Sequence, residues 1–231
     1  NGTPCEFDAE PGERVRDLLR RRGLLSVRNG CDGQGSCGAC SILLAGRTVN
    51  SCLLRAPQID GKQIRTVEHL AKTRDLSAIQ TAFLDAGVVQ CGYCSPAMLL
   101  AAEELLTRAE RPSREQIADA FSGVYCRCTG YEQLFAAVEL AAQRVQNPAQ
   151  ASRTTPEFRD DLRVIGKVKL KVDGPRLVRG DKAFVEDMVQ AGSCHLTMLG
   201  SPHAHAYIKK IDTTQAEATA GVILVLTHRN C

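Results

Sequence analysis

The fold is decided by one short stretch, Gly30-Cys31-Asp32-Gly33-Gln34-Gly35-Ser36-Cys37-Gly38-Ala39-Cys40, which carries three cysteines and four glycines. A loop that wraps around a metal–sulfur centre must turn sharply and point backbone N–H groups at sulfur. Glycine allows both, because a positive φ costs it little. The residues that follow, 41–51, read as a strand, a turn at Gly46 and a returning strand. Such a hairpin brings Cys52 back beside Cys40 and adds a fourth thiol.

Eight of the eleven cysteines fall into two sets of four. The first set is Cys31, Cys37, Cys40 and Cys52, with gaps of five, two and eleven residues. The second set is Cys91, Cys94, Cys126 and Cys128, with gaps of two, thirty-one and one. Four thiolates are what a [2Fe-2S] cluster requires, so the two sets predict two clusters and a short path for electrons.

Zinc is the alternative that the cysteine spacing leaves open. Zinc loops favour two short-spaced pairs, which the glycine-rich first set does not supply. The second set, taken alone, is compatible with zinc through its two close pairs. Iron is favoured there because the second set follows directly after a ferredoxin-type loop. The first gap of that loop is five residues, one more than in the plant-type pattern.

Helical patterns predominate from Asp75 to the end of the 140s, and they predict four helices. The first carries a stripe from Leu76 to Leu84 and is closed by Gly87; the second runs from Ser95 to about Ala109. The third opens at Ser113, with Gln116 at the capping-box position and Gly123 after it; the fourth opens at Thr129, with Glu132 in that position. Each close cysteine pair of the second set then precedes a helix N-terminus, where backbone N–H groups favour a negative cluster.

Composition excludes several classes of function. Aromatic residues make up 4% of the 231 residues and Trp is absent, which argues against a stacking surface for single-stranded nucleic acid. The net charge of +3 is too small to indicate a polyanionic partner. Five arginines gather between residues 14 and 22, and we interpret them as a solvated helix face in preference to a docking patch. They are Arg14, Arg16, Arg20, Arg21 and Arg22.

The remaining cysteines, Cys5, Cys194 and Cys231, are an odd, scattered number, unlike a disulfide-stapled secreted domain. The sequence has no apolar run of eighteen residues and no signal-peptide pattern, so it predicts a cytoplasmic protein without a membrane span. Because it opens at Asn1 without Met, a short leader could precede it.

Together these motifs resemble the iron–sulfur part of the molybdenum hydroxylases, the xanthine dehydrogenase and aldehyde oxidoreductase family. The segments that carry the resemblance over about residues 1–150 are Gly30–Cys40, Gln90-Cys91-Gly92-Tyr93-Cys94-Ser95-Pro96 and Cys126-Arg127-Cys128-Thr129-Gly130-Tyr131. The resemblance implies an α+β chain: a β-grasp plant-type ferredoxin domain (1–73), then a four-helix [2Fe-2S] domain (74–146). The family usually has Asn-Leu where Val124-Tyr125 stands and Gly where Ala97 stands, which we expect to alter local packing only.

The same resemblance implies the positions of the cofactors. The helical domain's cluster would lie nearer the molybdenum, and the ferredoxin-like cluster would pass electrons to a flavin, with FAD on a partner chain. Gln90 and Cys128 match positions that the family places against the pterin of the molybdenum cofactor. For Gln90, a surface amide beside a ligand remains an equal alternative.

A linker is predicted over residues 147–163, and the composition changes after it. Residues 164–168 and 169–172 read as strand-like runs, Gly174-Pro175 as a turn, and 222–226 as a buried strand. Residues 164–231 resemble the start of the α/β hammerhead region of the molybdenum subunit, in an incomplete form. The resemblance rests on the runs 163–167, 199–206 and 211–213.

His203 and His205 alternate within the 199–206 run. We assign them structural roles in preference to a metal pair, because no cysteine or carboxylate joins them at ligand spacing. No catalytic residue is predicted in this chain, since the resemblance implies that the substrate site lies downstream or on a molybdenum-binding partner.

The predicted function is electron transfer in a molybdenum-dependent hydroxylase, with a weak preference for purine or xanthine oxidation over aldehyde or carbon monoxide oxidation. A freestanding two-cluster carrier and a zinc-stabilised interaction module are the alternatives. No nucleic-acid partner is expected.

Overall fold

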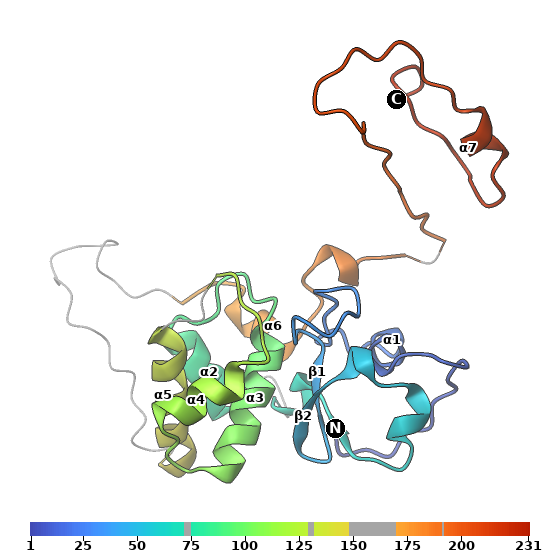
Figure 1. Cartoon of the computed structure of the whole chain (residues 1–231). Helices are drawn as coiled ribbons and strands as arrows, with labels where there is room; N and C mark the ends of the chain where they lie inside the picture. The colour runs from blue at the N-terminus through green and yellow to red at the C-terminus, as the bar shows by residue number, and fades with distance from the viewer. Residues whose placement is uncertain (72–74, 129–131, 148–169, 191) are drawn as a thin grey trace, which may run out of the picture. The chain divides into compact units, whose positions relative to one another are not determined.

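The computed structural model describes residues 1–71, 75–128, 132–147, 170–190 and 192–231. The chain forms two compact units, Asn1–Val189 and Gln190–Cys231, and Figure 1 follows it from blue at the N-terminus to red at the C-terminus. The first unit contains all eight clustered cysteines. None of the helices among the described residues has the length and apolar character needed to cross a membrane.

A small antiparallel sheet organises the N-terminal part of the first unit. Its strands are β1 (Ser41–Leu44), β2 (Arg47–Asn50) and β3 (Ile64–Arg65), in the order β2-β1-β3. Ala45 and Gly46 join β1 to β2 with φ values of 50° and 81°, as a two-residue hairpin turn requires. The predicted hairpin is therefore confirmed. Its return brings Ser51 N within 3.4 Å of the Cys40 carbonyl oxygen, so Cys52 follows directly beside Cys40.

Helix α1 (Val15–Arg21) packs its apolar face into the core of this part. Val15, Leu18 and Leu19 are almost fully buried and meet Ile42 of the sheet. Three short 3-10 helices complete it: η1 (Ser51–Leu53), η2 (Ala56–Ile59) and η3 (Val67–His69). A sheet with a helix on it, followed by a helical part, gives the α+β class that was predicted.

The C-terminal part of the same unit is helical. Its helices are α2 (Ala78–Asp85), α3 (Ser95–Arg108), α4 (Arg114–Phe121) and α5 (Glu132–Gln146). Ser77 and Ser113 form capping boxes with Gln80 and Gln116, which stabilise the starts of α2 and α4. The predicted second and third helices are confirmed closely. The predicted start of the fourth, Thr129, lies outside the described residues.

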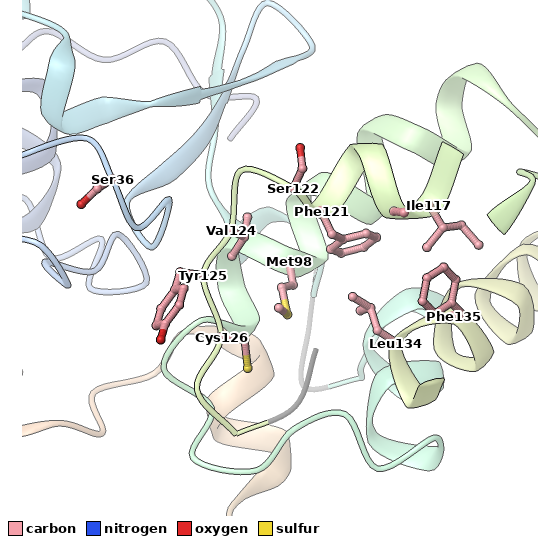
Figure 2. A pocket seen from close by; sticks show the side chains of 11 residues that line it. Ser36, Met98, Ile117, Phe121, Ser122, Val124, Tyr125, Cys126, Leu134 and Phe135 are labelled. Carbon is pink, nitrogen blue, oxygen red and sulfur yellow. The ribbon is translucent and has the colours of Figure 1, made fainter. Parts of the chain in front are cut away.

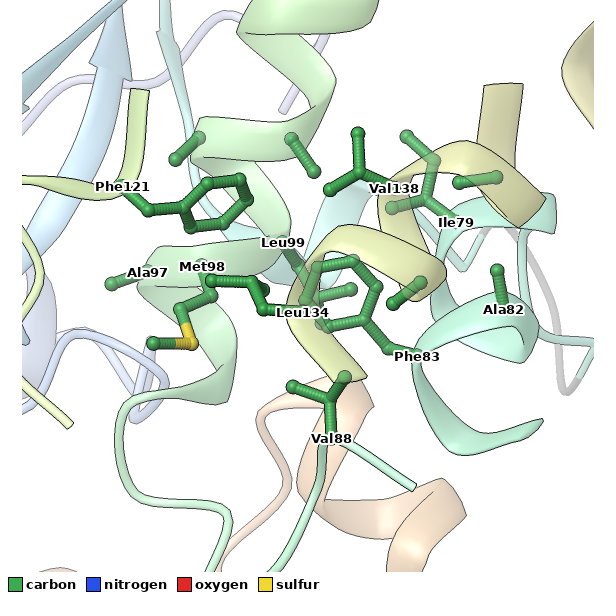
Figure 3. Packing of buried hydrophobic residues seen from close by; sticks show 14 of the residues in the cluster. Ile79, Ala82, Phe83, Val88, Ala97, Met98, Leu99, Phe121, Leu134 and Val138 are labelled. Carbon is green, nitrogen blue, oxygen red and sulfur yellow. The ribbon is translucent and has the colours of Figure 1, made fainter. Parts of the chain in front are cut away.

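The helices enclose a core that the hydrophobic stripes supply. Phe83 of α2, Leu99 of α3 and Val138 of α5 are fully buried and converge with Leu134 and Phe121 (Figure 3). Burying a side chain of this size contributes about 1.5–3 kcal/mol. This core holds the ends of α2, α3 and α4 at fixed positions, and the second cysteine set lies at those ends.

Residues 170–189 form the last part of the first unit, and their structure differs from the prediction. The strand-like runs from 164 lie partly outside the described residues, and 170–172 form no strand. Gly174-Pro175 begins helix α6 (Gly174–Arg179), where a turn was predicted. That prediction was wrong because proline also suits the first turn of a helix. The 3-10 helix η4 (Val185–Asp187) follows.

The second unit, Gln190–Cys231, contains helix α7 (Thr214–Ala218) and no strand among its described residues. Ile223 and Leu224 are 80% and 67% exposed, so the prediction of a buried strand at 222–226 is wrong for this chain. A strand needs a neighbour to satisfy its backbone and cover its side chains. Neither is supplied within this unit, and the predicted α/β character of 164–231 is not seen in it.

Candidate metal centres

The first cysteine loop adopts the backbone that its glycines predict. Gly33, Gly35 and Gly38 have φ values of 79°, 77° and 68°, and Asp32 has 50°. At Gly30 a Cβ atom would lie 3.0 Å from the Cys37 sulfur. The loop therefore needs glycine for its turns and for the space beside the thiols.

The four thiols of the first set lie in two pairs. Cys31 and Cys37 are within hydrogen-bonding reach of each other, and so are Cys40 and Cys52. Burial would raise the pKa of Cys31, but hydrogen bonds from Cys37 and Ser36 outweigh it and lower that pKa to about 6. Burial, together with the neighbouring Cys52, raises the pKa of Cys40 to about 11. Burial also raises the pKa of Cys37, so Cys31 is shifted towards the thiolate, whereas Cys37 and Cys40 are shifted towards the neutral thiol.

The second set is brought together by three helix ends. Cys91 and Cys94 lie in the turn between α2 and α3, and Cys126 and Cys128 follow α4. Cys91 is paired with Cys128, and Cys94 with Cys126. Burial is the main cause that raises the pKa of both Cys91 and Cys94.

The chemistry of the four thiols in each set fits a binuclear iron centre. A [2Fe-2S] cluster distributes four thiolates over two irons. Each set supplies four thiols, every one of which lies near another thiol of the same set. The residues present therefore fit the cluster. The assignment of the eight cysteines as ligands stays a prediction.

The two candidate centres are joined through their loops. Tyr125 N donates a hydrogen bond to the Cys37 carbonyl oxygen at 2.9 Å. A Cβ atom at Gly38 would lie 2.0 Å from the Gly123 carbonyl oxygen. The first cysteine loop therefore contacts the segment that leads into Cys126 at backbone distance. This contact uses the backbone at Val124-Tyr125, where the sequence departs from the resembled family.

A cavity of about 400 Å³ lies beside Cys126 (Figure 2). Met98, Phe121 and Leu134 are among the side chains that line it, and most of its other lining residues are also apolar. Cys126 lines this cavity and packs against the edge of the helical core. The hydrophobic surroundings of a cluster help to set its potential.

Gln90 is exposed and Cys128 is partly exposed. Their predicted position against a pterin stays a prediction, since that group would lie outside this chain. His203 and His205 are exposed in the second unit. Cys5, Cys194 and Cys231 are exposed and lie outside both sets.

The interpretation of the N-terminal arginines as a solvated face is wrong for two of them. Arg16 is 7% exposed, and Arg20 donates hydrogen bonds to the Glu186 carbonyl oxygen at 3.2 Å and to Asp187 Oδ1 at 3.0 Å. The opposite charge that draws Arg20 inward lies 167 residues away in sequence. The local sequence pattern around Arg20 therefore could not predict this contact.

Arg28 and Asp187 form a buried ion pair for which the sequence also carried no local signal. Arg28 Nη1 lies 2.5 Å from Asp187 Oδ2, and both side chains are fully buried. Burial would raise the pKa of Asp187, but the amides of Ala183 and Phe184 and the guanidinium groups of Arg20 and Arg28 outweigh it. They lower that pKa to about 2.

This depressed pKa predicts a loss of stability in acid. An unfolded aspartate titrates near pH 3.9, so the contribution of Asp187 is complete above about pH 4 and is lost as the pH falls towards 2. The difference corresponds to about 2 kcal/mol of unfolding free energy. Glu186 also lies within 3.6 Å of Arg20, and it partly replaces the charge that protonation removes.

Urea unfolding of the wild type and of Asp187→Asn between pH 5 and pH 2 checks this prediction. We expect the gap between their midpoints to narrow towards pH 2, since acid acts on the rest of both proteins equally. A difference between the two urea midpoints that stays constant with pH contradicts the lowered pKa of Asp187.

Comparison with known proteins gives three family matches along the chain. Residues 1–71 match the 2Fe-2S iron-sulfur cluster binding domain, and residues 66–139 match the [2Fe-2S] binding domain. Residues 179–231 match the a/b hammerhead domain of aldehyde oxidase and xanthine dehydrogenase.

Individual relatives fall into two kinds. The probable hypoxanthine oxidase XdhD of Escherichia coli K12 is 46% identical over 231 residues, which are 100% of this chain and 24% of that protein. The nicotinate dehydrogenase small FeS subunit of Eubacterium barkeri is 45% identical over 148 residues, which are 64% of this chain and 94% of that subunit. The chain thus spans about a quarter of the former relative and nearly all of the latter.

Solved structures agree with these matches. The aldehyde oxidoreductase of Desulfovibrio desulfuricans superposes with a TM-score of 0.82 at 32% identity, covering 96% of this chain and 25% of that one. The quinoline 2-oxidoreductase of Pseudomonas putida 86 superposes with a TM-score of 0.58 at 38% identity, covering 61% and 88%. The chain therefore belongs to the aldehyde oxidase and xanthine dehydrogenase family, and it carries that family's two iron–sulfur domains.

Proposed function

We propose that this chain is the electron-transfer part of a molybdenum-dependent hydroxylase, with one [2Fe-2S] cluster in each cysteine set. The observation that carries the proposal is the direct contact between the two cysteine loops. Tyr125 N donates a hydrogen bond to the Cys37 carbonyl oxygen. Electrons passing between the two centres would therefore have a short path through the protein. When bound, the clusters supply one-electron redox chemistry.

The chain's own residues hold and separate the two centres. The glycine loop orients its thiols, and the helical core fixes Cys94 at the start of α3. Burial keeps water from Cys40, Cys52 and Cys94. Burial and hydrogen bonds to sulfur are the means by which a protein sets a cluster potential.

The domain limits follow from the same proposal. We assign residues 1–73 to a β-grasp ferredoxin-like domain, 74–146 to a four-helix cluster domain, 147–163 to a linker and 164–231 to the start of the hammerhead domain. The family matches at 1–71, 66–139 and 179–231 support these limits approximately.

The partners and substrate are also proposals. Electrons would come from a molybdopterin centre near Gln90 and Cys128, held by the remainder of the polypeptide or by another subunit, and would leave to FAD on a partner chain in the cytoplasm. A purine is the favoured substrate class, because the hypoxanthine oxidase relative is 46% identical over the chain and an aldehyde oxidoreductase relative 36%.

Metal analysis with visible spectroscopy on anaerobically purified native protein, which keeps any molybdenum-binding part or partner, tests the proposal. We expect about four irons per chain and a red-brown spectrum that bleaches with dithionite, as two [2Fe-2S] clusters require. Co-purified molybdenum would support the hydroxylase assignment, and its absence from protein with both clusters would favour a freestanding carrier. Zinc in place of iron would overturn the proposal.

A further inference from the structure

Around residues 170–189, the boundary between family domains and the boundary between compact units do not coincide. The hammerhead family match begins at residue 179, yet the compact unit that contains both cysteine sets extends to Val189. The start of the third family domain is thus packed on the first two. We call residues 170–189 the docking segment.

Helix α6 of the docking segment fits the surface of the helical part closely. Leu177 and Val178 are 3% and 0% exposed. A Cβ atom at Gly92 would lie 2.7 Å from Leu177 Cδ1, so the turn between Cys91 and Cys94 accepts α6 only because it has glycine there. Gln80 Nε2 donates a buried hydrogen bond of 2.9 Å to the Val178 carbonyl oxygen.

The docking segment also contacts the ferredoxin-like part. At Gly180, whose φ is 79°, a Cβ atom would lie 2.4 Å from Ser26 Cβ and 2.8 Å from Val67 Cγ1. The segment therefore lies against both domains of the first unit, in orange beside α3 in Figure 1.

The end of the docking segment is fixed by charge and by aromatic rings. Asp187 accepts hydrogen bonds from Arg20 of α1 and from Arg28, which lies in the loop before the first cysteine set. The guanidinium carbon of Arg28 lies 4.6 Å from the centroid of the Phe184 ring. Tyr93, between Cys91 and Cys94, meets Phe184 edge-on at 5.1 Å and donates to Glu186 Oε2 at 3.1 Å.

These contacts have the composition of a stable interface between separate chains. They combine a buried apolar helix face, an arginine stacked on an aromatic ring, and a desolvated ion pair. The small FeS subunit from Eubacterium barkeri aligns over 148 residues, which are 64% of this chain and 94% of that subunit. A related iron–sulfur module therefore also occurs as a separate subunit.

We propose that the docking segment is an interdomain latch, which holds the downstream part of the protein on the iron–sulfur module without help from the covalent linker. Asp187 is the positioning residue of this latch. It joins Arg20 and Arg28, and through Phe184 and Glu186 the segment covers Tyr93 in the turn of the second cysteine set.

Cleavage of the linker in the folded 231-residue chain tests this directly. A specific protease site is placed between residues 150 and 165, the chain is loaded with iron and sulfide, cut, and run on a size-exclusion column. We expect the fragment that begins after the cut to co-elute with the iron–sulfur fragment. Separate elution of the two wild-type fragments would overturn the proposal, and this outcome does not depend on any variant folding.

Asp187→Asn, compared with Asp181→Asn, tests the role of the ion pair. Asp181 lies in the same segment but forms an exposed pair with Arg179, so Asp181→Asn is the matched control. Removing one partner of a buried pair is strongly destabilising, so we expect Asp187→Asn to weaken fragment association about a hundredfold or more. Equal association of the two cut variants would overturn the assignment of Asp187.

Discussion

Replacing Cys94 by serine is expected to remove one of the two clusters and leave the other. Cys94 is buried at the start of α3 and paired with Cys126, so its loss takes one of four thiolates from the helical site. The iron content should fall from about four to about two per chain. Cys40→Ser should give the same iron loss from the first site.

The two variants are distinguished by the signal that remains. Electron paramagnetic resonance of the dithionite-reduced protein should show one cluster signal in Cys94→Ser and the other in Cys40→Ser. Cys5→Ser is the control, because Cys5 is exposed and outside both sets, and it should keep all of the iron. Loss of both signals from either single variant would mean that the cysteines do not form two independent sites.

The second large effect is expected at Gly38. Its φ of 68° costs a residue with a Cβ atom about 1–2 kcal/mol, and the Cβ atom would also lie 2.0 Å from the Gly123 carbonyl oxygen. A backbone atom cannot move aside as a side chain can. We expect Gly38→Ala to lower the free energy of unfolding by about 2–5 kcal/mol in total.

Gly46→Ala provides a matched control for this change. Gly46 has a φ of 81°, but no atom lies within 4 Å of the position that a Cβ atom would take there, so only the backbone cost of about 1–2 kcal/mol applies. Denaturant unfolding of the two variants separates conformational strain from steric overlap. Equal destabilisation of the two would contradict the close approach between the cysteine loops.

The hairpin and the first three helices of the second part were predictable because their signals are local. Gly46 and the residues around it specify a two-residue turn, and Ser77 and Ser113 cap helices whose apolar stripes follow at once. The pairing of the thiols within each set was not predicted. It depends on how the glycine loop and the hairpin fold in the first set and on how three helix ends meet in the second, which spacing alone does not determine.

The errors concern residues whose environment is set by distant parts of the chain. Arg20 is drawn to Asp187 by a contact that spans 167 residues, and no periodicity within its own helix reports that. Gly174-Pro175 suits either a turn or a helix start, and packing against Leu84 favours the helix. Residues 222–226 have the composition of a strand, but a strand also needs a neighbour.

The contact between Cys37 and Tyr125 has a consequence for how such proteins can be rearranged. The backbone of the first cysteine loop is hydrogen-bonded to the backbone of the segment that leads into Cys126. An insertion or deletion in either segment would therefore displace both. Shuffling of the ferredoxin-like part onto a foreign helical partner would expose the polar groups that now satisfy each other. The two domains therefore form one unit of recombination, and we expect gene fusion and fission to occur after the pair and not between its members.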